Sequence, residues 1–133
     1  MRPVFAVIFL LAFGGCSYAL QIEFFNGTLK PIIFCSIGEV KSECTTVPAQ
    51  SVAALQWIAG EFTIESAGCV RLYALKPPEP LQDYVEIQEH VVKARIEPDG
   101  RLFLTPHRIG GFSNTIEQPS GYPAEPATTQ GQC

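Results

Sequence analysis

Five cysteines are the residues of this chain with the clearest capacity for chemistry. Cys16 lies in an N-terminal leader considered below, which leaves Cys35, Cys44, Cys69 and Cys133 for the rest of the chain. In an exported protein, four such thiols predict up to two disulfides, with three ways to pair them. A zinc site would need clustered ligands, and the sequence has neither a C-x-x-C motif nor a Cys/His cluster. The residue pattern therefore predicts disulfides, and neither a metal nor a cofactor.

The cysteine spacing favours one pair, Cys35 with Cys44. These two positions are symmetric about Glu39-Val40 and would face each other across a hairpin. Closing so short a loop would contribute roughly 2.5–3 kcal/mol in the chain-entropy model. Cys133 is open to two interpretations. It is either a partner in a second disulfide or a free or intermolecular thiol.

Groups for acid–base or nucleophilic catalysis are few. His90 has Glu89 beside it, but adjacent side chains on a strand point to opposite faces, so this pair is poorly placed for general base catalysis. Ser66-Ala67-Gly68-Cys69 resembles a reactive-cysteine segment, although a disulfide is the expected state of Cys69 in an oxidising compartment. No nucleophile elbow, H-E-x-x-H motif or phosphate-binding glycine loop occurs. We therefore predict no catalytic residues.

The first 19 residues have the organisation of an export signal. Arg2 supplies a positive start, and Val4 to Phe13 form an apolar run that is too short to span a bilayer and has the length of a signal-peptide core. Ser17-Tyr18-Ala19 is a small-x-small cleavage site, which would release a soluble chain that starts at Leu20. The predicted location is outside the cytosol: the periplasm or outer membrane of a bacterium, or the secreted fraction otherwise.

A second cleavage point precedes Cys16. Leu10 to Cys16 resembles the lipobox of bacterial lipoproteins, in which the cysteine is acylated and becomes the first residue of the mature chain. The two glycines before Cys16 fit that pattern, and Phe13 departs from it, because the family prefers Leu, Val or Ile three residues before the cysteine. The resemblance covers the leader alone. It implies cleavage after residue 15 and a membrane anchor through Cys16; with the other cleavage, Cys16 is discarded.

The mature chain is short and acidic. About 115 residues remain after the leader, enough for one domain. Without Arg2 they hold eight Lys/Arg against thirteen Asp/Glu, a net charge of −5, which argues against nucleic acid or anionic lipid headgroups as partners. No second apolar run approaches membrane length. Asn26-Gly27-Thr28 is a sequon for N-glycosylation in a eukaryotic source and a turn otherwise.

Between Leu20 and Thr105 the apolar residues recur mostly with a period of two, which is typical of strands with one buried face. Turn signals such as Glu97-Pro98-Asp99-Gly100 separate these runs at short intervals. The pattern predicts an all-β domain over residues 20–105, a small antiparallel sandwich or barrel of about seven to eight strands. Its core would hold five aromatic side chains: Phe24, Phe34, Trp57, Phe62 and Tyr73.

Three segments depart from this simple alternation. Residues 84–96 alternate as strands in two opposite phases, which a bulge near Glu89-His90 would reconcile, and a helix from Asp83 is the alternative. Residues 76–83 begin with a Pro-rich extended connector. From residue 106 to residue 133 the composition shifts to Gly, Pro, Ser, Thr and Gln, so we expect a disordered tail.

These features favour a non-enzymatic binding or structural module that is exported or part of the cell envelope. Small β domains usually bind through loops or an exposed sheet edge, so the connector 76–83 and the hairpin tip at Gly38 would meet a protein or envelope partner. Two alternatives stay open. The Cys-bearing β runs and the Ser66-Ala67-Gly68 turn are similar to small periplasmic lysozyme inhibitors, which implies an inhibitor of a secreted hydrolase. Acylation of Cys16 would instead imply a structural lipoprotein associated with the outer membrane.

Overall fold

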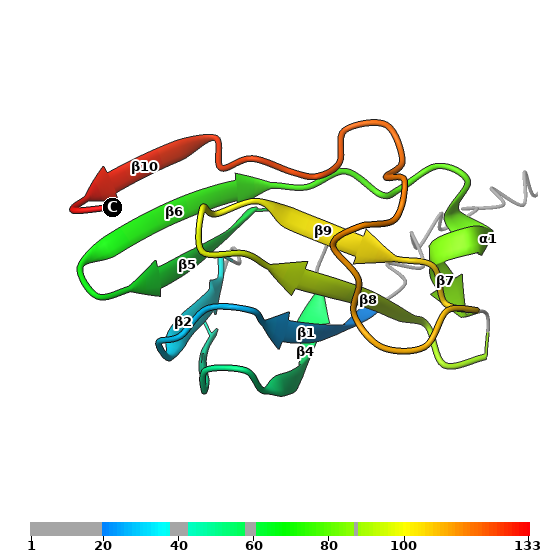
Figure 1. The fold of residues 1–133 in the computed structure, drawn as a ribbon, viewed down its shortest axis with the longest axis horizontal. Coiled ribbons are helices and arrows are strands. Elements are labelled where there is room, and N and C mark those ends of the chain that lie inside the picture. Colours follow the sequence, from blue (N-terminus) through cyan, green and yellow to red (C-terminus); the bar gives the residue numbers. More distant parts are fainter. Residues whose placement is uncertain (1–19, 38–42, 58–60, 87) are drawn as a thin grey trace, which may run out of the picture.

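The computed structural model describes residues 20–37, 43–57, 61–86 and 88–133. These residues form ten strands and one short helix, arranged as two five-stranded sheets that pack face to face (Figure 1). The all-β sandwich prediction is confirmed. The leader with Cys16 and both cleavage sites lies outside the described residues, as do the hairpin tip at Gly38 and the side chain of Trp57.

Sheet A has the strand order β4-β1-β8-β7, and β9 pairs with β8 as well. β1 pairs antiparallel with β4 but parallel with β8, where Ile22 lies opposite Val92. A parallel pair needs a long crossover, and here the chain passes twice through the other sheet between β1 and β8. The strands of sheet A are β1 (Leu20–Asn26), β4 (Val52–Trp57), β7 (Val85–Glu86), β8 (Val91–Ile96) and β9 (Leu102–Thr105).

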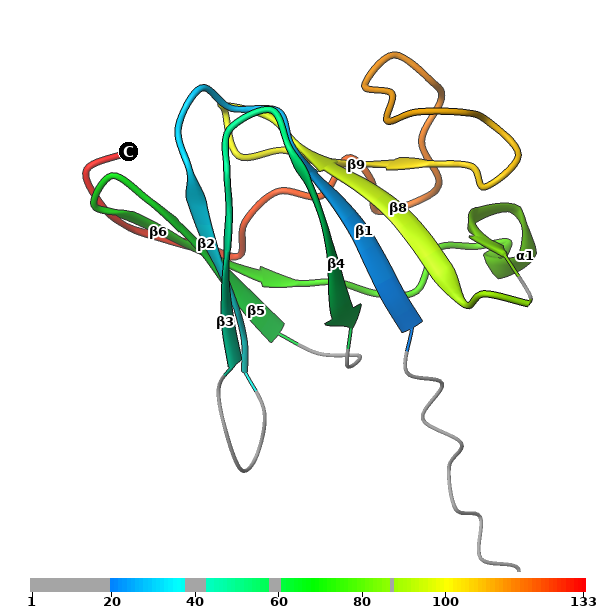
Figure 2. The same cartoon turned by 90° about the horizontal axis from the view of Figure 1, so that it is seen from below.

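Sheet B is antiparallel throughout and has the order β10-β6-β5-β2-β3. Its edge strand β3 lies next to β4, the edge strand of sheet A, at one side of the sandwich (Figure 2). Its strands are β2 (Ile32–Ser36), β3 (Glu43–Val47), β5 (Glu61–Ser66), β6 (Cys69–Ala74) and β10 (Thr128–Gly131).

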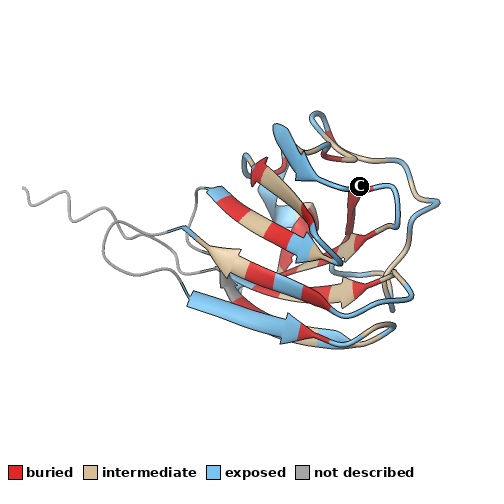
Figure 3. Ribbon diagram, turned by 90° about the vertical axis from the view of Figure 1, so that its left-hand side faces the viewer, coloured by how far each residue is buried: buried red, intermediate tan, exposed pale blue. Residues whose placement is uncertain are grey.

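Side chains from both sheets fill the core, and buried positions alternate with more exposed ones along β1, β5 and β8, whereas all four residues of β9 are buried (Figure 3). Phe24, Phe34, Phe62 and Tyr73 are at most 3% exposed, which confirms four of the five predicted aromatic core residues. Their rings form a continuous row with centroid separations of 5.6, 4.7 and 5.2 Å. This row crosses from β1 of sheet A to β2, β5 and β6 of sheet B, so it joins the two layers.

Residues 81–86 and 91–96 form a helical turn and two paired antiparallel strands. Helix α1 (Leu81–Tyr84) ends after one turn, β7 follows it directly, and the chain reverses before β8. Val85 lies opposite Val92 and both are buried, so the strand interpretation is confirmed. The predicted bulge is wrong, because the opposite phases come from two strands of a hairpin. His90 occupies the reversal with a φ of +52°.

The segment after Thr105 is ordered, which corrects the prediction of a disordered tail. β10 pairs with β6, and Ala124 forms a backbone bridge with Leu102 through hydrogen bonds of 2.8 and 2.9 Å. The Gln118 side chain bonds both backbone groups of Leu104, at 2.8 and 2.9 Å. A polar segment of this kind gains order by completing strand edges that the sheets leave open, which composition alone does not reveal.

Part of the same segment covers the outer face of sheet A. The Phe112 ring stacks on Phe25 with centroids 5.6 Å apart, and Arg95 donates to the Phe112 carbonyl at 3.3 Å. Lys93 donates to the Ile109 carbonyl, and burial lowers the pKa of this lysine, partly opposed by the charge of Glu23. Sheet A is therefore packed on both faces over these positions.

Candidate functional site

Two disulfides connect the four cysteines of the described chain. Cys35 and Cys44 are direct register partners on β2 and β3, with Cα atoms 4.1 Å apart, so the predicted pair is confirmed. The second disulfide joins Cys69 at the start of β6 to Cys133, across 64 residues of sequence. Both bonds are compatible with an oxidising environment outside the cytosol.

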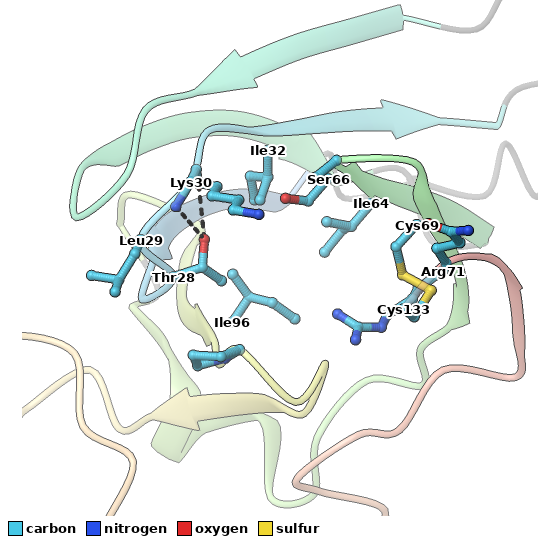
Figure 4. A pocket seen from close by; sticks show the side chains of 13 residues that line it. Thr28, Leu29, Lys30, Ile32, Ile64, Ser66, Cys69, Arg71, Ile96 and Cys133 are labelled. Carbon is cyan, nitrogen blue, oxygen red and sulfur yellow. Dashed lines mark hydrogen bonds between the residues drawn. A yellow bond between two sulfur atoms is a disulfide. The ribbon is translucent and has the colours of Figure 1, made fainter.

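A cavity of about 360 Å³ opens at the end of the sandwich that holds the second disulfide (Figure 4). It lies between the sheets, where the β1–β2 loop, the β5–β6 turn and the β8–β9 turn approach one another. The lining residues are Thr28, Leu29, Lys30, Ile32, Ile64, Ser66, Ala67, Cys69, Arg71, Ile96, Pro98, Gln132 and Cys133.

Three isoleucines give the cavity an apolar floor. Ile32 on β2, Ile64 on β5 and Ile96 on β8 are 1%, 3% and 1% exposed. Each occupies an inward position of its strand, so the floor is the end of the hydrophobic core and contains contributions from both sheets. Packing already excludes these three side chains from water, and the exposed apolar residues of the lining are Leu29, Ala67 and Pro98.

Asn26 organises the loop that forms one wall. Its fully buried side chain accepts hydrogen bonds from the backbone N–H and hydroxyl of Thr28 at 3.0 and 2.7 Å, and its Nδ2 donates to the Lys30 carbonyl at 2.8 Å. The same Nδ2 donates to the carbonyls of Val47 and Pro48 at 3.1 and 3.2 Å. The network places Thr28, Leu29 and Lys30 along the rim.

This network also bears on the predicted sequon. A glycan would be attached at Asn26 Nδ2, which is buried and donates to three backbone carbonyls. A glycan at that atom and the folded β1–β2 loop therefore exclude each other. In the native structure Asn26-Gly27-Thr28 is a loop-organising element.

Arg71 supplies the opposite wall. It faces inward on β6 between Cys69 and Tyr73, because alternate residues of a strand share a face. Its side chain lies against Gly100, where a Cβ would be 2.7 Å from Arg71 Nε. Gly100 has a φ of +87°, and its carbonyl accepts a 2.5 Å hydrogen bond from the Tyr73 hydroxyl. The β8–β9 turn thus positions the arginine.

Both charged side chains that line the cavity are cations. Lys30 and Arg71 lie on opposite sides of it (Figure 4), and its lining includes no Asp or Glu. The nearby Asp99 is engaged elsewhere, with its oxygens accepting from Arg101 N and Nε at 3.0 and 2.6 Å. Burial opposes the charge of Asp99, but these hydrogen bonds and the charges of Arg101 and Arg71 lower the pKa of Asp99 overall.

Neither cavity cation has a hydrogen-bonded partner for its charged group in the part of the chain that the structure describes. The hydrogen bonds of Lys30 use its backbone, and the interaction of Arg71 with Asp99 is electrostatic, without an ion pair within 4.0 Å. The cavity hydroxyls are occupied: the Thr28 hydroxyl lies 2.7 Å from Asn26 Oδ1 and 2.8 Å from the Lys30 carbonyl and donates its one proton to either of them, and Ser66 donates to the Pro31 carbonyl at 3.4 Å. The two cations and the Gln132 side-chain amide, whose residue bonds through its backbone N–H, are therefore the side chains of the lining with donors available for a ligand.

The other residues singled out in the sequence do not gather at this cavity. Glu89 and His90 are exposed in the β7–β8 turn, not on a strand. Within the described residues, no group of three His, Cys, Asp or Glu side chains could hold a metal ion. The helix present there is too short to cross a membrane.

The connector 76–83 lies at the opposite end of the sandwich from the cavity (Figure 1). Pro78 is fully buried, and the Lys76 carbonyl accepts a 2.6 Å hydrogen bond from the Tyr122 hydroxyl. The Asp83 carbonyl accepts from the His107 N–H at 3.1 Å. Much of the connector therefore serves to attach the C-terminal segment.

Arg71 was not among the site residues predicted from the sequence, although one feature of the sequence indicated that it faces inward. Tyr73 is a predicted core residue, and the residue two positions earlier on a strand must share its face. The role of Lys30 had no such signal, since its placement depends on the Asn26 network. Comparison with protein-family models, with curated proteins and with solved structures finds no match for this chain.

Proposed function

We propose that this protein is an exported, non-enzymatic binding module that holds a small ligand in the cavity between its two sheets. The cavity itself carries the proposal. Its volume of about 360 Å³ lies within the range of roughly 300–1,000 Å³ found for ligand sites. Ligand sites also combine an apolar lining with a few convergent polar groups, which here are Lys30 and Arg71.

The walls of the cavity are fixed before any ligand arrives. The Asn26 side chain holds the β1–β2 loop, the Cys69–Cys133 disulfide holds the C-terminal segment, and Gly100 supports Arg71. A preformed site loses little conformational entropy when a ligand binds, and therefore binds it more tightly. The proposal assigns no reaction to the site.

Native mass spectrometry of the mature, oxidised protein tests this proposal. The protein is incubated with a small-molecule extract of its producing cells and we expect a bound mass that Ser66→Trp removes, because the indole would fill the cavity mouth. Thr63→Trp is the matched control, since Thr63 lies on the outer face of the same strand. Thermal unfolding establishes that both variants fold. The absence of a bound mass, or equal retention by both variants, would contradict the proposal.

Export forms part of the proposal and has its own test. Intact mass spectrometry of the protein from its native source distinguishes an acylated chain that begins at Cys16 from a free chain that begins at Leu20. Acylation would place the module on a membrane through Cys16, and cleavage before Leu20 would release it. A stable precursor in the cytosol with reduced cysteines would overturn the exported location.

A further inference from the structure

We infer that the ligand of this cavity is an amphiphilic anion, an alkyl chain that ends in one carboxylate. The inference rests on the proposed function and names the chemical class of the ligand. The acid would lie between Lys30 and Arg71, and the chain would lie along the exposed apolar residues of the lining, which are Leu29, Ala67 and Pro98. The juxtaposition of two cations and exposed apolar side chains in one cavity carries the inference.

Arg71 provides the strongest part of the argument. A guanidinium presents five N–H donors in a planar fork, and it binds carboxylates with two parallel hydrogen bonds. The Arg71 side chain is half-buried on the inner face of β6, yet within the described chain it makes no hydrogen bond. Its nearest acid, Asp99, is hydrogen-bonded to Arg101 instead. Donors that are partly removed from water without an acceptor favour the entry of an anion.

Lys30 reinforces this preference from the other wall. The whole chain has a net charge of −4, whereas the charged side chains that line the cavity are two cations, with no Asp or Glu among them. An anion is attracted to such a site even though the protein as a whole would repel it. The exposed Leu29 beside Lys30, at 86% exposure, adds an apolar contact at the rim.

The exposed part of the lining explains why the ligand is amphiphilic and not a small inorganic anion. Leu29, Ala67 and Pro98 are apolar and exposed, whereas the three isoleucines of the floor are already excluded from water by packing. An alkyl chain that covers the exposed apolar residues removes them from water, which favours binding in proportion to the apolar area removed from solvent. An anion without such a chain would leave these residues in contact with water.

Isothermal titration calorimetry with four probes tests the ligand class. We expect decanoate to bind about tenfold or more tightly than decanol, which has the chain without the charge, and we expect no detectable binding of acetate. Decyl phosphate tests whether the acid group of the ligand is a carboxylate or a phosphate. Binding tighter than that of decanoate would overturn the carboxylate assignment, and weaker binding would support it. Equal affinities for decanoate and decanol would overturn the inference.

Charge-removing variants locate the acid. Arg71→Gln should weaken decanoate binding about tenfold and leave decanol binding unchanged, and Arg71→Lys should fall between, because it keeps the charge but not the fork. Lys30→Gln should weaken decanoate binding about threefold, since this exposed lysine is more flexible and better solvated. Lys76→Gln is the matched control, because it makes the same charge change in the connector between β6 and α1, and Lys76 does not line the cavity.

The outcomes separate this inference from the proposed function. Unchanged decanoate affinity in folded Arg71→Gln overturns the inference. A bound natural ligand that carries no acid and is removed by Ser66→Trp also overturns the inference, but in that case the proposed function stands. If no probe binds and no bound mass accompanies the native protein, both are overturned.

Discussion

Cys35–Cys44 and Cys69–Cys133 differ in what they connect. The first joins two residues that strand pairing already places opposite each other in one hairpin, nine positions apart in sequence. The second joins β6 to the end of a polar segment 64 positions later, and both of its cysteines line the cavity. One bond therefore reinforces local structure, and the other creates a boundary of the candidate site.

Chain entropy gives this difference a magnitude. A cross-link restricts the unfolded chain more when the loop it closes is longer. The model gives roughly 2.5–3 kcal/mol for the short loop of Cys35–Cys44 and about 4 kcal/mol for the long loop of Cys69–Cys133. The long-range bond should thus matter more for stability, and it is the one that should also matter for ligand binding.

The largest effect is expected when the long-range bond is removed. Cys69→Ser with Cys133→Ser should lower the free energy of unfolding by about 4 kcal/mol and should also weaken ligand binding, because the C-terminal segment loses its covalent attachment to β6. Urea unfolding and calorimetry measure the two quantities. A double variant that binds decanoate as tightly as the wild type would show that the disulfide is not part of the site.

Removal of the hairpin bond should have a smaller and purely structural effect. Cys35→Ser with Cys44→Ser should lower the free energy of unfolding by roughly 2.5–3 kcal/mol, since the hairpin register persists through backbone hydrogen bonds. Ligand affinity should stay at the wild-type value, measured on the same instrument. A parallel loss of affinity would remove the distinction between the two bonds.

A substitution at Asn26 tests whether its side-chain hydrogen bonds hold the β1–β2 loop in place, as the Cys69–Cys133 disulfide holds the C-terminal segment. Asn26→Ala should cost about 2 kcal/mol, because it leaves buried carbonyls without donors. It should also weaken decanoate binding through the displaced Lys30. Asn114→Ala is the control: its exposed side chain makes one hydrogen bond to Glu97, and its loss should cost less than about 0.5 kcal/mol. Similar losses of stability in the two variants would contradict the role given to Asn26.

The smallest effect concerns alkaline pH. Burial raises the pKa of Tyr73 to about 12, and burial likewise raises the pKa of Tyr122 to about 12, against an ordinary value of 10.0. Above pH 10 the unfolded chain loses these protons while the folded chain keeps them, so stability is complete below pH 10 and declines toward pH 12. Thermal unfolding from pH 9 to 11 should show a shallower decline for Tyr73→Phe/Tyr122→Phe than for the wild type. An unchanged slope would show that other groups dominate.

The sequence predicted those features that depend on neighbours along the chain. The period of two between Leu20 and Thr105 identified strands, and the symmetry of Cys35 and Cys44 identified their pairing. The aromatic residues Phe24, Phe34, Phe62 and Tyr73 were identified as core for the same reason, since alternation assigns each to a face. The export leader remains a prediction.

Features that depend on residues far away in the chain could not be predicted from the sequence. Residues 106–133 are too polar to predict order by themselves, and they gain it from the open edges of β6 and β9 and from Cys69. The parallel pairing of β1 with β8 likewise has no local signature. In each case the partner lies dozens of residues away, and composition carries no information about it.

The amino-acid sequence by itself determined the all-β character, the inward residues of most strands and the hairpin disulfide, because backbone alternation acts over a few residues. The tertiary structure alone decided that Arg71 and Lys30 line opposite sides of one cavity that has three isoleucines at its floor. This arrangement requires the β1–β2 loop, strand β6 and the β8–β9 turn to converge at one end of two packed sheets, and only the packing of the sheets brings them together.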